Sequence, residues 1–165
     1  MASRKGVVLT IVILAVITGA SFLFWSIPQE TESTFVVSDY ANYLDGVKKI
    51  HEILQEDIEV EFQNMIDGKI TPDEYIAITE ITTSQVTAKI SEFVTSKPSE
   101  IWQESYISYM DALKKFNSYV VETKVYANMV QDNEDDTKMA EVLEKINTLK
   151  KETEELVKKS NELRP

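Results

Sequence analysis

The sequence predicts an all-α protein in which one N-terminal transmembrane helix precedes an antiparallel four-helix bundle. Three observations indicate this. Residues 6–27 form one uncharged run, and apolar residues after it recur at spacings of three and four. Only four glycines and four prolines occur in the chain, mostly between these periodic stretches. The part after the run is long enough to build a core of its own.

Residues 6–27 are predicted to be a transmembrane anchor. Arg4 and Lys5 stand directly before the run, and at about 1.5 Å per residue a helix of this length spans the roughly 30 Å of bilayer hydrocarbon. A cleaved secretory signal and a buried core helix are the alternatives, since Thr18 and Ala20 could precede a cleavage site. The length of the run and the interfacial position of Trp25 favour an uncleaved anchor.

The charges around the run predict its orientation. Because basic residues beside a span prefer the cytoplasm, residues 1–5 become a cytoplasmic tip, 28–34 a tether and 35–165 an extracytoplasmic bundle. We therefore expect a single-pass cell-membrane protein. The bundle and tether carry 15 basic against 28 acidic residues, a formal charge of −13. Such a domain repels nucleic acid and anionic lipid. Because of the anchor, the expected partners are the lipid bilayer and other integral membrane subunits.

The first two bundle helices are predicted at 36–67 and 72–96. Gly68 suits the end of the first, while Thr71 and Glu74 form a capping box at the start of the second. The first apolar face comprises Tyr40, Tyr43, Leu44, Val47, Ile50, Leu54, Ile58, Phe62 and Met65. The second comprises Tyr75, Ile78, Ile81, Gln85, Val86, Ile90 and Phe93. Pro98 requires this second helix to stop before it.

The third and fourth bundle helices are predicted at 99–131 and 137–163, with Ser99 as the cap of the third. The third face comprises Trp102, Tyr106, Tyr109, Leu113, Phe116, Val120 and either Thr123 or Lys124. The fourth comprises Met139, Val142, Ile146, Leu149, Thr153, Leu156, Ser160 and Leu163. Thr153 and Ser160 weaken this last seam, so the helix either closes the bundle, projects beyond it or packs against another chain.

The acidic segment 132–136 is similar to half a calcium-binding loop. Thr137 stands where that loop needs glycine, and Leu143 stands where it needs a bidentate glutamate. The segment is therefore interpreted as a solvated loop that places negative charge at the start of the last helix.

The chain lacks the usual parts of catalytic sites, so we expect no enzyme activity, no cofactor and no metal. It has no cysteine and one histidine, His51, which is expected at the rim of a helical face because one imidazole rarely completes a metal site. The tyrosines are interpreted as core and rim residues whose hydroxyls reach solvent. Expected interaction residues are Gly19, Ala20 and Ser21, small enough for close helix approach in a membrane, and Trp102 as an exposed contact.

Three stretches carry a family resemblance: VVSDYANYLDGVKKIHEIL, DGKITPDEY and WQESYISYMDALKKFNSYV. Together with the anchor they resemble small membrane-anchored helical proteins of ammonia-oxidising archaea, in particular the accessory subunits of archaeal ammonia monooxygenase. The resemblance implies that copper and chemistry lie in other subunits and that this chain caps or braces the outer face of the assembly.

The sequence thus predicts a non-catalytic, membrane-anchored accessory or scaffold subunit of a membrane protein complex. An extracytoplasmic helical bundle that senses a ligand and signals through a partner is the alternative. A partner is needed because only five residues precede the apolar run.

Overall fold

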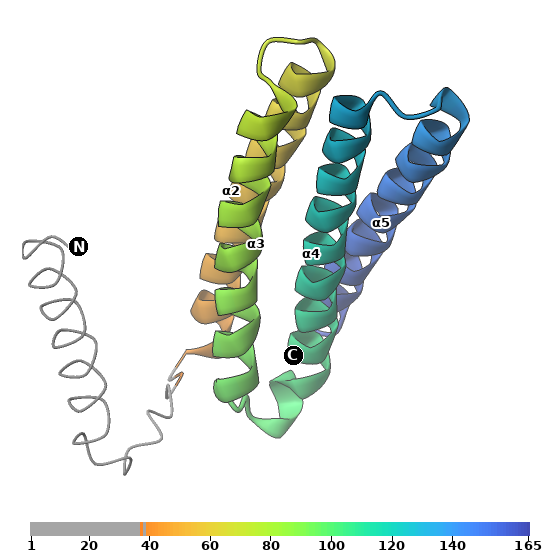
Figure 1. Ribbon diagram of the computed structural model, residues 1–165. Helices are drawn as coiled ribbons and strands as arrows, with labels where there is room; N and C mark the ends of the chain where they lie inside the picture. Colours follow the sequence, from red (N-terminus) through yellow and green to blue (C-terminus); the bar gives the residue numbers. More distant parts are fainter. Residues whose placement is uncertain (1–36, 38) are drawn as a thin grey trace, which may run out of the picture. The chain divides into compact units, whose positions relative to one another are not determined.

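A computed structural model describes Val37 and residues 39–165. The chain divides into two units, Met1–Thr34 and Phe35–Pro165. Within the described residues the second unit is a bundle of α-helices without strands (Figure 1), which confirms the all-α bundle. The expected anchor at 6–27 lies outside the described residues. In the part that is described, no helix combines the length and the apolar character that crossing a bilayer requires.

Four long helices make up the bundle, and each runs opposite to the one before it (Figure 1). They are α2 (Tyr40–Ile66), α3 (Pro72–Thr95), α4 (Gln103–Asp132) and α5 (Asp136–Glu162), with a short 3₁₀ helix η1 (Glu100–Trp102) before α4. The start of α2, the α3–α4 connection and the end of α5 therefore share one end of the bundle.

Local capping explains where the first helices stop and start. Gly68 has a φ of +70° and follows the last turn of α2, a conformation that glycine adopts without a Cβ penalty. At the start of α3, the Glu74 carboxylate accepts a hydrogen bond from the Thr71 backbone N–H (2.7 Å), and Thr71 Oγ1 accepts one from the Glu74 N–H (3.3 Å). The predicted capping box is confirmed, and α3 ends at Thr95, before Pro98.

Two helix starts differ from the prediction. α2 begins at Tyr40 and not at 36, because Asp39 is extended and its side chain caps the first turn. Ser99 makes no side-chain cap; its carbonyl accepts from the Trp102 N–H (2.9 Å) and opens η1, so α4 starts only at Gln103. The acidic loop behaves as interpreted, since Asp135 caps α5 through the Thr137 N–H (2.8 Å).

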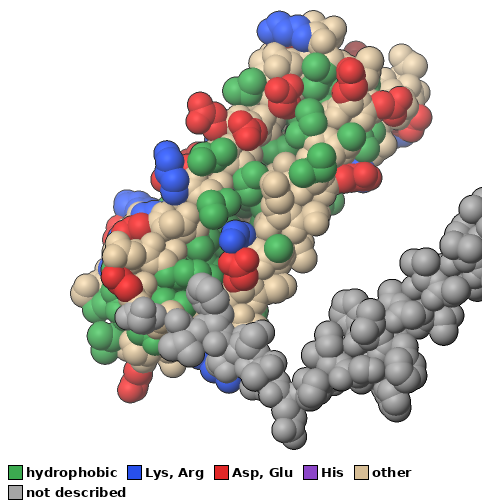
Figure 2. Space-filling view, turned by 90° about the vertical axis from the view of Figure 1, so that its left-hand side faces the viewer, with side chains coloured by type: hydrophobic (Ala, Val, Ile, Leu, Met, Phe, Trp, Pro, Cys, Tyr) green, Lys and Arg blue, Asp and Glu red, His purple; other side chains and the backbone are tan. Residues whose placement is uncertain are grey.

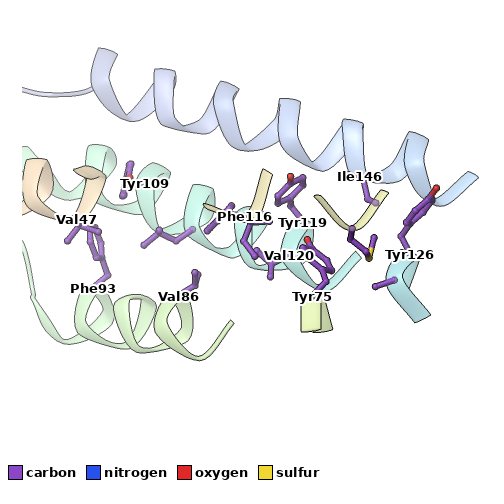
Figure 3. Close-up of a cluster of buried hydrophobic side chains, with 14 of the residues drawn as sticks. Val47, Tyr75, Val86, Phe93, Tyr109, Phe116, Tyr119, Val120, Tyr126 and Ile146 are labelled. Carbon is purple, nitrogen blue, oxygen red and sulfur yellow. The ribbon is translucent and has the colours of Figure 1, made fainter. Parts of the chain in front are cut away.

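α4 supplies half of the buried apolar residues, more than any other helix of the described residues. Its buried side chains point into the interior between the helices (Figure 3). The predicted face is confirmed from Tyr106 to Val120, with Thr123 rather than Lys124 as its last member, whereas Trp102 lies in η1 and is half-buried. The largest fully buried side chains are Tyr75, Tyr109, Phe116, Leu44, Ile58, Leu113, Val86 and Val120.

The predicted faces of α2 and α3 are wrong at three positions. Ile50 is 38% exposed, Ile81 is 61% exposed and Gln85 is exposed, whereas His51, Thr79 and Thr82 are buried. On each of these helices, the buried face is thus rotated slightly about the helix axis relative to the most apolar face. Thr79 can be buried because its hydroxyl donates to the Ile76 carbonyl within its own helix (2.6 Å).

α5 closes the bundle against α4 through small hydroxyl residues. Ser105 Oγ donates to the Ser160 carbonyl (2.8 Å), and Ser160 Oγ donates to the Ser105 carbonyl (2.8 Å). Ser108 Oγ donates to the Leu156 carbonyl (3.2 Å). Thr153 is also buried. Ser160 is therefore bonded to the facing helix, while the buried Thr153 donates to the Leu149 carbonyl of its own helix (2.8 Å), and α5 closes the bundle rather than projecting beyond it.

Candidate functional site

α5 meets α2 in a different way, through long polar side chains that reach across a gap. Three contacts join the two helices or their ends: Lys48 Nζ to Asn161 Oδ1 (2.6 Å), Lys150 Nζ to Glu59 Oε2 (2.8 Å), and Arg164 Nη2 to Asp45 Oδ1 (2.6 Å). Such contacts span more distance than the serine contacts of the α4–α5 seam. A groove therefore remains between the bridges.

This α2–α5 groove has a volume of about 260 Å³. Its buried floor consists of His51, Tyr109 and Thr153, and Val157 adds an apolar wall. Its remaining lining residues are polar or charged: Lys48, Glu52, Gln55, Glu154, Lys158 and Asn161. Positive and negative charges thus stand close together around a floor that is shielded from water.

His51 is the most unusual group on this floor. It is only 4% exposed, its Nδ1 lies 2.9 Å from the Tyr109 hydroxyl, and its ring centroid lies 4.6 Å from that of Phe116. Its Nε2 is buried and has no hydrogen-bond partner among the described residues. The expectation that His51 lies at a rim is therefore wrong; it occupies a core position of α2.

Burial fixes the protonation of the pair. Loss of solvation lowers the pKa of His51 to about 4, so the imidazole is neutral at pH 7. Burial likewise raises the pKa of Tyr109, which keeps the phenol protonated. The two groups therefore share a neutral hydrogen bond. Depending on the tautomer, His51 Nε2 is a donor or an acceptor without a partner among the described residues.

The groups that line the groove could recognise a small solute. Among residues 39–165 and Val37 no group of three or more histidine, cysteine, aspartate or glutamate residues could hold a metal ion. An unpartnered imidazole nitrogen, an apolar wall and charges of both signs suit a small solute that is polar at one end and apolar at the other.

A second surface lies between α2 and α3. It is a groove of about 400 Å³, called here the α2–α3 groove, lined by Ile50, Ile53, Leu54, Gln85, Ala88, Lys89 and Glu92. Ile53 is 47% exposed, and Ile81 lies further along α3 at 61%. Figure 2 looks at the side of the molecule where α2 and α3 lie in Figure 1, and apolar side chains gather along it.

The predicted interaction residues do not come together in the described structure. Gly19, Ala20 and Ser21 lie outside the described residues. Trp102 is half-buried: its ring lies 6.4 Å from that of Tyr40 (centroid to centroid), and the Arg164 guanidinium lies 5.8 Å from its centroid. The binding role of Trp102 stays a prediction, but its indole already has contacts within the bundle.

Several tyrosine hydroxyls also differ from the expectation that they reach solvent. Tyr75 donates to Thr123 Oγ1 (2.8 Å), Tyr106 donates to the Tyr40 carbonyl (2.9 Å), and Tyr109 bonds His51. These bonds link different helices, so the hydroxyls help to fix helix positions. The sequence does contain one signal for the exposed α2–α3 groove, because Ile53 is an apolar residue that lies outside the predicted buried face of α2.

Comparisons with family models, with curated proteins and with solved structures gave no match for this chain.

Proposed function

We propose that this chain is a non-catalytic, membrane-anchored accessory or scaffold subunit of a membrane protein complex. Residues 6–27 are the anchor, residues 1–5 are cytoplasmic, and the bundle stands outside the membrane on the far side. The uncharged run and the two basic residues before it support this placement. The acidic bundle makes protein and bilayer partners more suitable than nucleic acid.

The observation that carries the accessory role is the α2–α3 groove. Large apolar side chains at partial exposure, Ile50 and Ile53, line a hollow between the antiparallel helices α2 and α3. Exposed apolar surface of this kind marks interaction sites, and a groove between helices fits the apolar face of another helix. The partner proposed for it is a helix of a neighbouring subunit of the complex.

The sequence resemblance gives this proposal a specific form: an accessory subunit of archaeal ammonia monooxygenase, with the one termed subunit Z as the nearest. In that form the copper and the catalysis belong to other subunits. This chain braces the outer face, and Gly19, Ala20 and Ser21 contact a neighbouring span within the membrane.

Purification in mild detergent followed by lysine crosslinking and mass spectrometry tests the proposal. We expect stoichiometric membrane proteins to co-purify, with crosslinks from Lys89, which lines the α2–α3 groove. A protein that runs alone, without a stoichiometric membrane partner, contradicts the accessory role.

A matched pair of variants locates the contact. Ile53→Glu places a charge in the α2–α3 groove. It should lower the amount of partner recovered about tenfold, which corresponds to a loss of about 1.4 kcal/mol of binding free energy. Val121→Glu, at a similar 44% exposure on α4, should leave recovery unchanged. Gly19→Leu should weaken association through the span. Equal recovery for Ile53→Glu and Val121→Glu would place the contact elsewhere.

The α2–α5 groove favours a second candidate function, that of an extracytoplasmic bundle which senses a ligand and signals through a partner. The unpartnered Nε2 of His51 beside charges of both signs is the supporting observation. A thermal-shift screen of amino acids and short amines tests it, because a solute at a hundred times its dissociation constant should add about 2.7 kcal/mol of stability. Val157→Phe should fill the groove and abolish the shift. No shift with any of these solutes removes this candidate.

A further inference from the structure

The two ends of the α2–α5 groove present opposite charges. At one end, Lys48 Nζ lies 2.6 Å from Asn161 Oδ1. Further along both helices Glu59 meets Lys150 (2.8 Å), so α2 and α5 keep one antiparallel register over this stretch. Glu154 also lines the groove, and at about 1.5 Å per residue it lies about 10 Å along α5 from Asn161. The groove therefore runs from an ammonium group at Lys48 to a carboxylate at Glu154.

These two charges are also the ones in the groove that have no ionic partner among the described residues. Lys48 contacts only the neutral amide of Asn161. Glu154 has no hydrogen bond or ion pair with any described residue. The other two charged residues of the lining each have an opposite charge nearby, in the pairs Lys49–Glu52 (4.0 Å) and Lys158–Glu162 (3.8 Å). One cation and one anion are thus left for a ligand that carries both charges.

Between the two charged ends, His51 supplies a buried polar atom. It lines the groove and is only 4% exposed, and its Nδ1 lies 2.9 Å from the Tyr109 hydroxyl. A phenol O–H donates more readily than an imidazole N–H, and an imidazole nitrogen accepts more readily than a phenol oxygen. The favoured arrangement therefore has Tyr109 as the donor and the imidazole hydrogen on Nε2. This Nε2–H has no partner among the described residues, so an acceptor oxygen of a ligand would satisfy it.

We propose that the α2–α5 groove binds a small ω-amino acid, whose carboxylate accepts from His51 Nε2–H and Lys48 and whose ammonium group pairs with Glu154. This rests on the ligand-sensing candidate function and specifies its ligand. An α-amino acid carries both charged groups on one carbon atom, too close together to reach both ends. A longer chain separates them, and its methylene groups contact the apolar wall at Val157. The volume of about 260 Å³ lies below the roughly 300 Å³ at which pockets for drug-sized ligands begin, so the ligand is small.

The only histidine of the chain makes this site directly observable. In the detergent-solubilised full chain, labelled with isotope-enriched histidine and purified through a tag without histidine, every imidazole NMR signal belongs to His51. The spectrum without ligand should show the hydrogen on Nε2. Addition of 5-aminopentanoate should shift the imidazole signals saturably. Pentanoate and pentylamine each carry one of the two charges, so each should bind about tenfold more weakly or worse, as should glycine.

Two matched pairs of variants, each checked for folding by circular dichroism, locate the charges. Lys48→Gln and Glu154→Gln should each raise the dissociation constant about tenfold. Lys49→Gln and Glu155→Gln remove exposed charges outside the groove lining and should leave it unchanged.

Three results would overturn the proposal: imidazole signals that 5-aminopentanoate does not shift, a hydrogen on Nδ1 of His51, or equal effects within each pair of variants. If another solute raises the unfolding temperature while the His51 signals stay in place, the ligand-sensing candidate stands and the ω-amino acid is refuted. If no solute changes either measurement, both are refuted.

Discussion

α5 contacts its two neighbours in different ways. Against α4 it combines serines, whose hydroxyls reach the carbonyl of the facing helix as Ser105 and Ser160 do reciprocally at 2.8 Å, with two ion pairs, Lys115–Glu152 (2.7 Å) and Lys145–Glu122 (2.8 Å). Against α2 it uses long charged or amide side chains, such as Lys150 with Glu59. Small residues allow backbones to approach, and long ones hold helices apart. One helix thus builds a serine-bonded seam against α4, with a hollow of about 330 Å³ beside Ser108 and Leu156, and a groove against α2 that long side chains bridge.

The largest expected effect comes from overfilling the serine-bonded seam. Ser160→Leu should lower the free energy of unfolding by about 4 kcal/mol, because overpacking and the lost hydrogen bonds to Ser105 each cost about 2 kcal/mol. Urea unfolding of the detergent-solubilised chain, followed by circular dichroism, measures it.

Val157→Phe is the matched variant on the open side of the same helix. It adds bulk toward the α2–α5 groove, where space exists, and should change the free energy of unfolding by less than about 1 kcal/mol. If the two variants destabilise equally, the contrast between the seam and the groove is incorrect.

The next effect concerns pH. In the unfolded chain, His51 takes up a proton as the pH falls below its ordinary pKa of 6.5. In the folded protein it does so only when the pH falls to about 4. Stability is therefore lost as pH falls through this window, by about 2 kcal/mol between pH 7 and pH 5. His51→Phe should remove this component. Unfolding curves of both proteins at the two pH values give the difference, and parallel pH profiles would show that His51 does not titrate in this way.

The smallest effect is expected for the bridges over the groove. Glu59 and Lys150 are 33% and 37% exposed, so solvent screens their attraction. Glu59→Gln should cost about 0.5 kcal/mol or less, measured by the same urea titration. A loss as large as that of Ser160→Leu would mean that the bridges, and not the serine seam, hold α5 in place.

The helices themselves could be predicted because their signals are local. The capping box at Thr71, the glycine at 68 and Pro98 act on neighbouring residues, so the sequence alone places those boundaries. The buried positions of α5 were also predictable from periodicity. The role of Ser160 was not predictable, because a hydroxyl at such a position either weakens an apolar stripe or bonds a facing helix. Only the facing residue, Ser105, decides between the two.

The candidate grooves were hidden from the sequence for a related reason. Hydropathy ranks Ile50 above His51 and Ile81 above Thr82, yet the structure buries the polar member of each pair. The rotation of a helix about its own axis depends on all the helices that pack against it. A rotation that brings the next residue into the core moves an isoleucine to the surface. The contact between His51 and Tyr109 joins two separate helices, so no local pattern contains it.

The intact mass of the protein extracted from native membranes tests the central proposal of a retained anchor most directly. Removal of the residues before Ser21 would leave the exposed apolar start SFLFWSIP on a strongly acidic domain, a surface prone to aggregation. We therefore expect a mass near the 18.8 kDa of the full chain, with or without Met1. A mass lower by about twenty residues would reveal a cleaved signal of the usual length and contradict the membrane-anchored subunit.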